Sequence, residues 1–147
     1  DDAILRKPGK LTDEEFAAIK AHTVIGSQIL SRISSMPELQ YGALYHHERW
    51  DGRGYPKGLK GEEIPEAARI IAVADAYDAM TSNRSYRKAL TQDCVHDEIL
   101  NGIGRQFWPP AARAMLKMID QDIHYDMRQK NDESSQNDEQ KYEYGIS

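Results

Sequence analysis

The chain carries at residues 46–56 the stretch His46-His47-Glu48-Arg49-Trp50-Asp51-Gly52-Arg53-Gly54-Tyr55-Pro56. Two adjacent imidazoles run directly into a loop rich in glycine, and Asp75 follows within an otherwise apolar segment. Histidine and carboxylate side chains are common ligands of transition metals. The stretch therefore indicates a metal site with a stiff loop beside it.

The segments on both sides of this stretch have the periodicity of helices. Thr12 and Glu15 form a capping-box pattern, and apolar side chains follow at helical spacing over residues 13–33. Further caps, prolines and apolar spacings predict four more helices at residues 37–46, 66–80, 92–102 and 109–118. Neither an alternating strand pattern nor an internal repeat is visible, so the predicted fold class is all-α.

Composition sets limits on the kind of protein. The 147 residues suit one domain, and a net charge of −5 with interspersed signs argues against a nucleic-acid or anionic-membrane surface. The single cysteine, Cys94, rules out an internal disulfide and fits a reducing compartment, so we expect a cytoplasmic protein. Residues 128–147 are almost entirely polar, and we expect them to form a disordered tail after a domain at residues 1–127.

Asp75 is the most unusual residue of its segment. Residues 67–77 are apolar on nearly every face of a helix, which predicts that Asp75 is buried. A buried carboxylate needs a partner, because an unpaired charge is costly away from water. An ion pair with a neighbouring helix and a metal-ligand role both satisfy this need, and the residues alone leave the choice open.

The histidines supply the other candidate ligands. Consecutive side chains on a helix diverge by about 100°, so His46 and His47 can share a centre only at a helix end or across two metal ions. His22 lies on or beside the apolar stripe of the first helix, where a lone histidine is more often a core residue. Gly26 one turn later leaves room for a ligand or a helix. Three imidazoles and one carboxylate suit iron, manganese or zinc better than calcium or magnesium.

Two further groups of residues carry possible binding chemistry. Arg84 and Arg87 follow Asp75 closely, and guanidinium groups beside a metal suit a phosphate; the alternative is a solvated loop. In the loop, Trp50 and Tyr55 are candidates to line a pocket or contact a partner, while glycines and Pro56 fix its backbone. His96 and His124 are expected to be structural or exposed.

Six separated motifs give the chain a resemblance to a known family. They are Lys7-Pro8-Gly9-Lys10-Leu11, Lys20-x-His22 with Gly26, His46-His47-Glu48, Gly54-Tyr55-Pro56, Val73-Ala74-Asp75 and Arg84-x-Tyr86-Arg87. Together they span roughly residues 1 to 110 and resemble the HD-GYP family of cyclic di-GMP phosphodiesterases.

The resemblance implies a fold and a chemistry. It implies an HD-superfamily-like helical bundle and a centre of two or three iron or manganese ions, with His22, His46, His47 and Asp75 as ligands. Asp75, Arg84 and Arg87 would be the catalytic residues for hydrolysis to pGpG or GMP. The Gly54-Tyr55-Pro56 loop would dock partners, including a GGDEF-type diguanylate cyclase domain.

The resemblance also has a departure. The His-Asp dyad of the family would stand upstream of Asp1, so we expect this chain to be a piece of a longer protein without the N-terminal helices. Apolar stripes on the first and third helices would then be partly uncovered, which favours self-association. Two alternatives stay open: a non-catalytic signalling module that binds a cyclic dinucleotide or a cyclase partner, and a phosphohydrolase for a hybrid cyclic dinucleotide.

Overall fold

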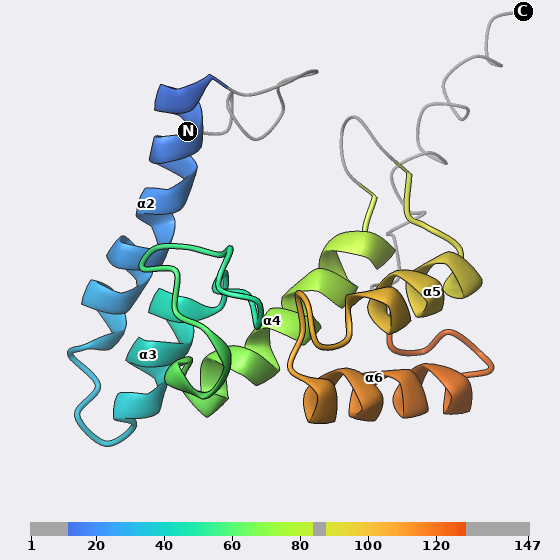
Figure 1. The fold of residues 1–147 in the computed structure, drawn as a ribbon. Coiled ribbons are helices and arrows are strands. Elements are labelled where there is room, and N and C mark those ends of the chain that lie inside the picture. The colour runs from blue at the N-terminus through green and yellow to red at the C-terminus, as the bar shows by residue number, and fades with distance from the viewer. Residues whose placement is uncertain (1–11, 84–87, 129–147) are drawn as a thin grey trace, which may run out of the picture.

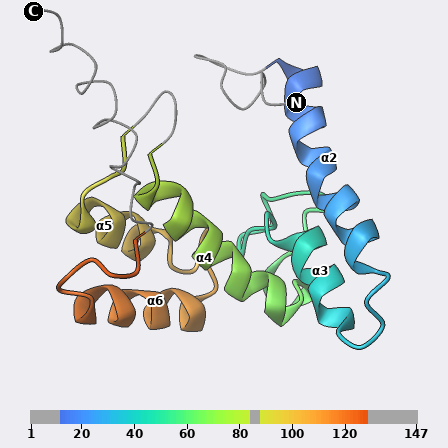
Figure 2. The same ribbon diagram turned by 180° about the vertical axis from the view of Figure 1, so that it is seen from behind.

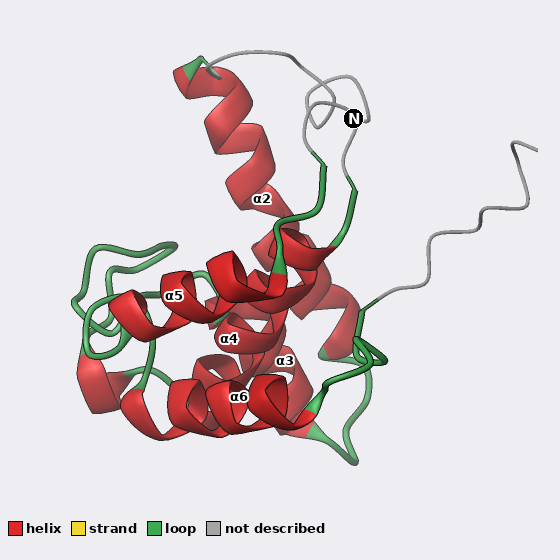
Figure 3. Cartoon of the chain, turned by 90° about the vertical axis from the view of Figure 1, so that its right-hand side faces the viewer, coloured by secondary structure: helices red, strands yellow, loops and turns green. Residues whose placement is uncertain are grey.

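The computed structural model describes residues 12–83 and 88–128, whose regular elements are all helical and which contain one isolated bridge between Ile103 and Phe107. This part of the chain contains five α-helices and a short 3₁₀ turn and no named strand, and Figures 1 and 3 show how the helices are arranged. The elements are α2 (Asp13–Leu30), α3 (Pro37–Tyr45), η1 (Gly61–Glu63), α4 (Glu66–Thr81), α5 (Gln92–Gly102) and α6 (Pro109–Gln121). The predicted all-α class is confirmed.

The helix ends follow local chemistry. The predicted capping box is present, since Thr12 Oγ1 accepts from Glu15 N–H at 3.2 Å and Glu15 Oε2 accepts from Thr12 N–H at 2.8 Å. Helix α2 ends at Leu30, three residues earlier than predicted, where the Ser31 hydroxyl donates to the Gln28 carbonyl at 2.7 Å. Helix α6 continues to Gln121 instead of Met118, because Ile119 is buried and extends its apolar face.

Helix α4 lies at the centre of the described structure and joins two layers (Figures 1 and 2). One end packs against α5 and α6 around the main core of Val73, Tyr77, Val95, Ile99, Phe107, Ala112, Leu116 and Ile119. The other end packs against α3, where Tyr45, Ile64 and Ala68 form a smaller cluster. The layer with α5 and α6 contains more of the buried apolar residues, and the layer with α3 carries His46 and His47 at the end of that helix.

Helix α2 packs on α3 through small and polar residues. Its buried side chains are Thr23 and Ser27, and a Cβ placed on Gly26 would lie 3.7 Å from the Cβ of Ala43. The room left by Gly26 therefore admits a neighbouring helix, one of the two uses considered for it. The apolar side chains of α2 largely face outward, with Ile25 54% and Ile29 64% exposed.

Exposed apolar side chains also occur on α4, where Ile70 is 51% exposed. The uncovered stripes expected on the first and third helices are therefore present. In the described ranges, none of the helices has the length and apolar character needed to cross a membrane.

Candidate metal centre

Three histidines meet where α2 packs against the end of α3. His22 comes from α2, His46 is the C-cap of α3, and His47 follows it. One ring nitrogen of each lies within 4.8 Å of the others. Because α3 ends at Tyr45, the two consecutive imidazoles need not diverge, and their ring centroids are 4.2 Å apart. Of the arrangements considered from sequence, the helix-end one is present.

Two of the imidazoles are oriented by backbone carbonyls one turn earlier. His22 Nδ1 lies at the Ile19 carbonyl, and His46 Nδ1 lies 2.8 Å from the Ala43 carbonyl. A carbonyl only accepts, so each Nδ1 donates to its carbonyl, and Nε2 is the ring nitrogen that is left to face the cluster. Metal-binding histidines are commonly oriented in this way by a carbonyl or carboxylate.

The resulting donor set fits a cation. His22 Nε2 and His46 Nε2 face each other at 3.5 Å. Neither of these nitrogens contacts a backbone carbonyl, so both are placed to face one shared ion. Nitrogen ligands around a tetrahedral ion with bonds of about 2.0–2.1 Å would lie about 3.4 Å apart. The described residues thus hold a histidine cluster of the kind that binds a metal ion.

His47 is held neutral by its surroundings. Burial, first, and then the neighbouring His46 lower its pKa from 6.5 to about 4, although Asp75 opposes the change. The Tyr55 ring stacks on His47 with centroids 4.8 Å apart and planes 23° apart. A neutral imidazole is the form that ligates metals, and it is present at neutral pH before any ion binds.

Asp75 lies near this cluster, but the prediction that it is buried was wrong. It is exposed on α4, while Val73 and Tyr77, two residues to either side, point into the core. The segment buries one face against α5 and α6, and Asp75 lies on a different face. Because the segment is apolar on nearly every face, its sequence pattern did not show which face would be buried. Burial is the larger cause that raises the pKa of Tyr55, and the negative charge of Asp75 raises it further. The charge of Asp75 therefore acts on a residue of the centre.

The remaining predicted site residues divide into two groups. Arg84 and Arg87 lie outside the described residues. Gly54, Tyr55 and Pro56 lie in the loop after the histidines, and the Tyr55–Pro56 peptide bond is cis. Tyr55 points inward onto His47, whereas Pro56 is exposed. Of the two uses considered for the Tyr55 ring, lining the site is the one its position favours.

Glu48 fixes this loop over the histidines, a role that the sequence did not reveal. Its side chain is only 3% exposed. Oε1 accepts from the N–H groups of Lys57 at 2.7 Å and Gly58 at 3.1 Å, and Oε2 accepts from Leu59 N–H at 3.0 Å. One buried carboxylate thus accepts from three consecutive backbone N–H groups and ties the far side of the loop to the end of α3.

Gly54 is required because the backbone passes too closely for a side chain. A Cβ at this position would lie 2.5 Å from both Glu48 Cα and the His47 carbonyl oxygen, and backbone atoms cannot move aside. We expect Gly54→Ala to lower the free energy of unfolding by about 2–3 kcal/mol through overpacking.

The matched control for that substitution is Gly26→Ala, where the new methyl group meets only an ordinary 3.7 Å contact within a helix. It should be neutral or stabilising by up to about 1 kcal/mol, since alanine favours helix. Urea unfolding of both variants tests the sign of each change, and equal stability of Gly54→Ala and wild type would contradict the close approach.

The loop is also docked to the turn before α6. Trp50 N–H donates to the Gln106 carbonyl at 3.1 Å, and Asp51 N–H donates to the Arg105 carbonyl at 2.8 Å. Arg49 donates to both carboxylate oxygens of Asp51, at 3.1 and 2.9 Å. These contacts join the histidine layer to the main core.

The Arg49–Asp51 pair gives the loop a pH dependence. The hydrogen bonds from Arg49, as the largest cause, lower the pKa of Asp51 from 3.8 to about 2. Because the folded pKa lies below the unfolded one, the pair stabilises the fold above pH 3.8, and this contribution is lost as the pH falls from 3.8 to about 2. Asp51→Asn should therefore be less stable than wild type at neutral pH and approach it in acid; a stability difference independent of pH would contradict this.

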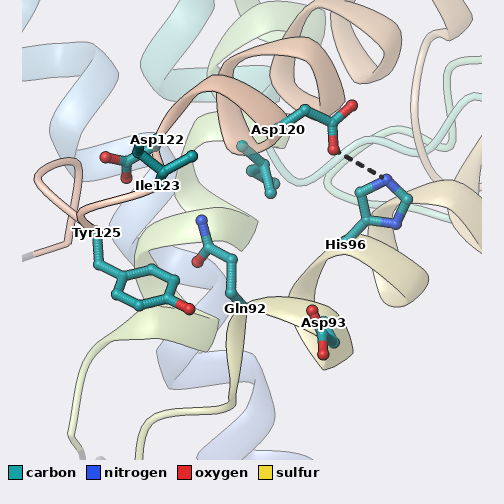
Figure 4. Close-up of a pocket in the computed structure, with 8 residues that line it drawn as sticks. Gln92, Asp93, His96, Asp120, Asp122, Ile123 and Tyr125 are labelled. Atoms are coloured by element: carbon teal, nitrogen blue, oxygen red, sulfur yellow. Dashed lines mark ion pairs between the residues drawn. The ribbon is translucent and has the colours of Figure 1, made fainter.

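His96 and His124 do not join the cluster. Figure 4 shows His96 in a separate polar pocket between α5 and α6, where Nε2 lies 3.6 Å from Asp120 Oδ1. His124 is exposed after α6. The expectation that both are structural or exposed agrees with these positions.

Comparison with known proteins identifies the family. Residues 2–107 match the family model described as HD domain, and the chain belongs to this family. It is 47% identical over 139 residues to a cyclic di-GMP phosphodiesterase of Thermotoga maritima, covering 92% of this chain and 38% of the relative. It is 40% identical over 124 residues to a 3′3′-cGAMP-specific phosphodiesterase 2 of Vibrio cholerae, covering 83% of this chain and 24% of the relative.

A solved structure shares the fold. The crystal structure described as a cyclic GMP-AMP-specific phosphodiesterase of V. cholerae superposes with a TM-score of 0.55 at 17% identity, over 84% of this chain and 32% of that one. These matches confirm the resemblance to the HD-GYP family drawn from the motifs. The chain spans between a quarter and two fifths of the length of these curated relatives.

Proposed function

We propose that this chain is part of a metal-dependent phosphodiesterase that hydrolyses cyclic di-GMP to pGpG or GMP in bacterial signalling. The observation that carries the proposal is the convergence of His22, His46 and His47, whose ring nitrogens lie within 4.8 Å of one another. The similarity to a phosphodiesterase over 92% of the chain supports it. We assign the reaction to the bacterial cytoplasm.

The proposed centre holds two or three divalent ions, iron or manganese, with His22, His46, His47 and Asp75 as ligands. Such ions supply Lewis-acid stabilisation of the negative charge that develops on a phosphoryl group. The protein's own part is to fix the ligands: two backbone carbonyls orient His22 and His46, and the Tyr55 ring packs on His47. Asp75 is suited to complete the set because its exposed carboxylate acts on His47.

Arg84 and Arg87 are proposed to bind the phosphate. A guanidinium group donates two parallel hydrogen bonds to phosphate oxygens and stabilises charge on them. Both residues follow α4, the helix that carries Asp75, within a few positions in the sequence.

Cyclic di-GMP turnover by the full-length protein tests the proposal. With iron or manganese supplied, the protein should convert cyclic di-GMP to pGpG or GMP, and a chelator should abolish turnover. Intact nucleotide after incubation with the metal-loaded protein would contradict it.

A hybrid cyclic dinucleotide is the second candidate substrate. It is favoured by the 40% identity to a relative described as 3′3′-cGAMP-specific. Parallel assays with cyclic di-GMP and 3′3′-cGAMP separate the two, because the preferred substrate will have the higher kcat/KM.

Two kinds of protein partner are proposed as well. The loop that exposes Pro56 and Lys57 is a stiff surface suited to binding a GGDEF-type diguanylate cyclase domain. The exposed apolar face of α2 is suited to self-association of the protein. Pro56→Asp should weaken cyclase binding in a pull-down, and Ile29→Asp should lower the mass measured by light scattering. Unchanged binding or mass would contradict the respective proposal.

A further inference from the structure

Lys20 belongs to one of the six motifs, but the proposed ligand set gives it no role. It lies on α2 two residues before His22 and is half-buried. Its Nζ atom is 4.2 Å from the centroid of the Phe16 ring and 5.4 Å from that of the Tyr55 ring. Since Tyr55 itself stacks on His47, one aromatic ring separates this ammonium group from the histidine cluster.

The aromatic rings hold Lys20 without using its hydrogen-bond donors. Phe16 and Tyr55 meet edge to face with centroids 6.0 Å apart, and the ammonium group lies over both rings. In the part of the chain that the structure describes, no carboxylate lies within ion-pair distance of it. A ring face attracts the charge but accepts no strong N–H bond, so the donors remain available to a ligand.

The electrostatics of the centre give this charge a use. Asp75 places a negative charge near His47 and Tyr55, and the phosphodiester of the proposed substrate is an anion. The positive charge of Lys20 reduces the repulsion between the Asp75 carboxylate and the phosphodiester. A charge-assisted hydrogen bond to phosphate is stronger than a partly exposed cation–π contact, so a phosphate oxygen will draw the ammonium group away from the rings.

We propose that Lys20 is a substrate-binding residue whose ammonium group donates a hydrogen bond to a phosphate oxygen of the cyclic dinucleotide. The inference rests on the proposed function. It assigns a phosphate-binding role to a residue of α2, in addition to the arginines proposed after α4.

Steady-state kinetics of the full-length, manganese-loaded protein with cyclic di-GMP test this role in wild type, Lys20→Met and Lys20→Arg. Lys20→Met should raise KM about tenfold and change kcat less than about threefold, because a charge-assisted contact in the bound complex is lost. Lys20→Arg should restore KM to within about threefold, since it keeps the charge. Lys117→Met, an exposed lysine on α6, removes the same charge and should behave as wild type.

Two further measurements distinguish a role of Lys20 in substrate binding from a role in holding the Tyr55 ring in place. Bound metal per chain and melting temperature should be the same in wild type and Lys20→Met. An unchanged KM in Lys20→Met would overturn the assignment. A loss of bound metal and of kcat that Lys20→Arg fails to restore would also overturn it, and Lys20 would then only stabilise the packing of the Phe16 and Tyr55 rings. If wild type itself neither binds nor hydrolyses cyclic di-GMP, the proposed function fails and takes this inference with it, a result distinct from a defect confined to the Lys20 variants.

Discussion

Replacement of His46 by alanine is expected to remove bound metal and to reduce cyclic di-GMP turnover by more than about a hundredfold. His46 offers Nε2 at 3.5 Å from His22 Nε2, while its Nδ1 is fixed on the Ala43 carbonyl. Alanine leaves His22 and His47 without the ligand that lies between α2 and the loop. Metal analysis of the purified full-length variant and a nucleotide assay measure the two losses separately.

The control is His124→Ala, which removes an exposed imidazole outside the cluster. It should keep the metal content and turnover of wild type. A His46→Ala variant with full metal content and full turnover would show that the three histidines pack together for a structural reason only.

Glu48→Gln is expected to lower the free energy of unfolding by about 2–4 kcal/mol, which is large for a change of one oxygen to nitrogen. The amide keeps one acceptor, but its NH₂ group would face backbone N–H donors that now bond to the carboxylate. The loop should open locally, releasing Tyr55 from His47. Urea unfolding measures the stability, and hydrogen exchange of the Lys57, Gly58 and Leu59 amides reports the local opening.

Glu63→Gln is the matched control. Its Oε2 also accepts a backbone N–H, from Lys60 at 2.9 Å, but the side chain is exposed, so water replaces the lost bond. Its cost should stay below about 1 kcal/mol. Equal stabilities of the two variants would mean that the buried carboxylate does not hold the loop.

The sequence allowed the helices to be predicted because caps and periodicity act locally. The Thr12–Glu15 box, the prolines at the starts of α3 and α6, and the cap at Thr91 are all present. The predictions that were wrong concern the positions of helix ends and the face of α4 that is buried. Asp75 was placed in the core because an apolar segment does not say which of its faces is covered, and this depends on the packing of α5 and α6.

The three histidines could be singled out from the sequence, but their arrangement in space could not be predicted. His22 is far from His46 in the chain, and only the packing of α2 on α3 brings their Nε2 atoms together. The function of Glu48 was invisible for the same reason, since its three donors lie nine to eleven residues later in a loop whose path cannot be read from composition. Lys20 likewise acquires its neighbours Phe16 and Tyr55 from one helical turn and one tertiary contact.

The most direct test of the metal-centre assignment is metal content together with cyclic di-GMP turnover, compared between these 147 residues and a form extended at the N-terminus. We expect the extended form, loaded with iron or manganese, to retain the metal and to hydrolyse cyclic di-GMP, and we expect both properties to depend on His46. A folded extended form that binds no metal and leaves the nucleotide intact would contradict the account and favour a non-catalytic binding module.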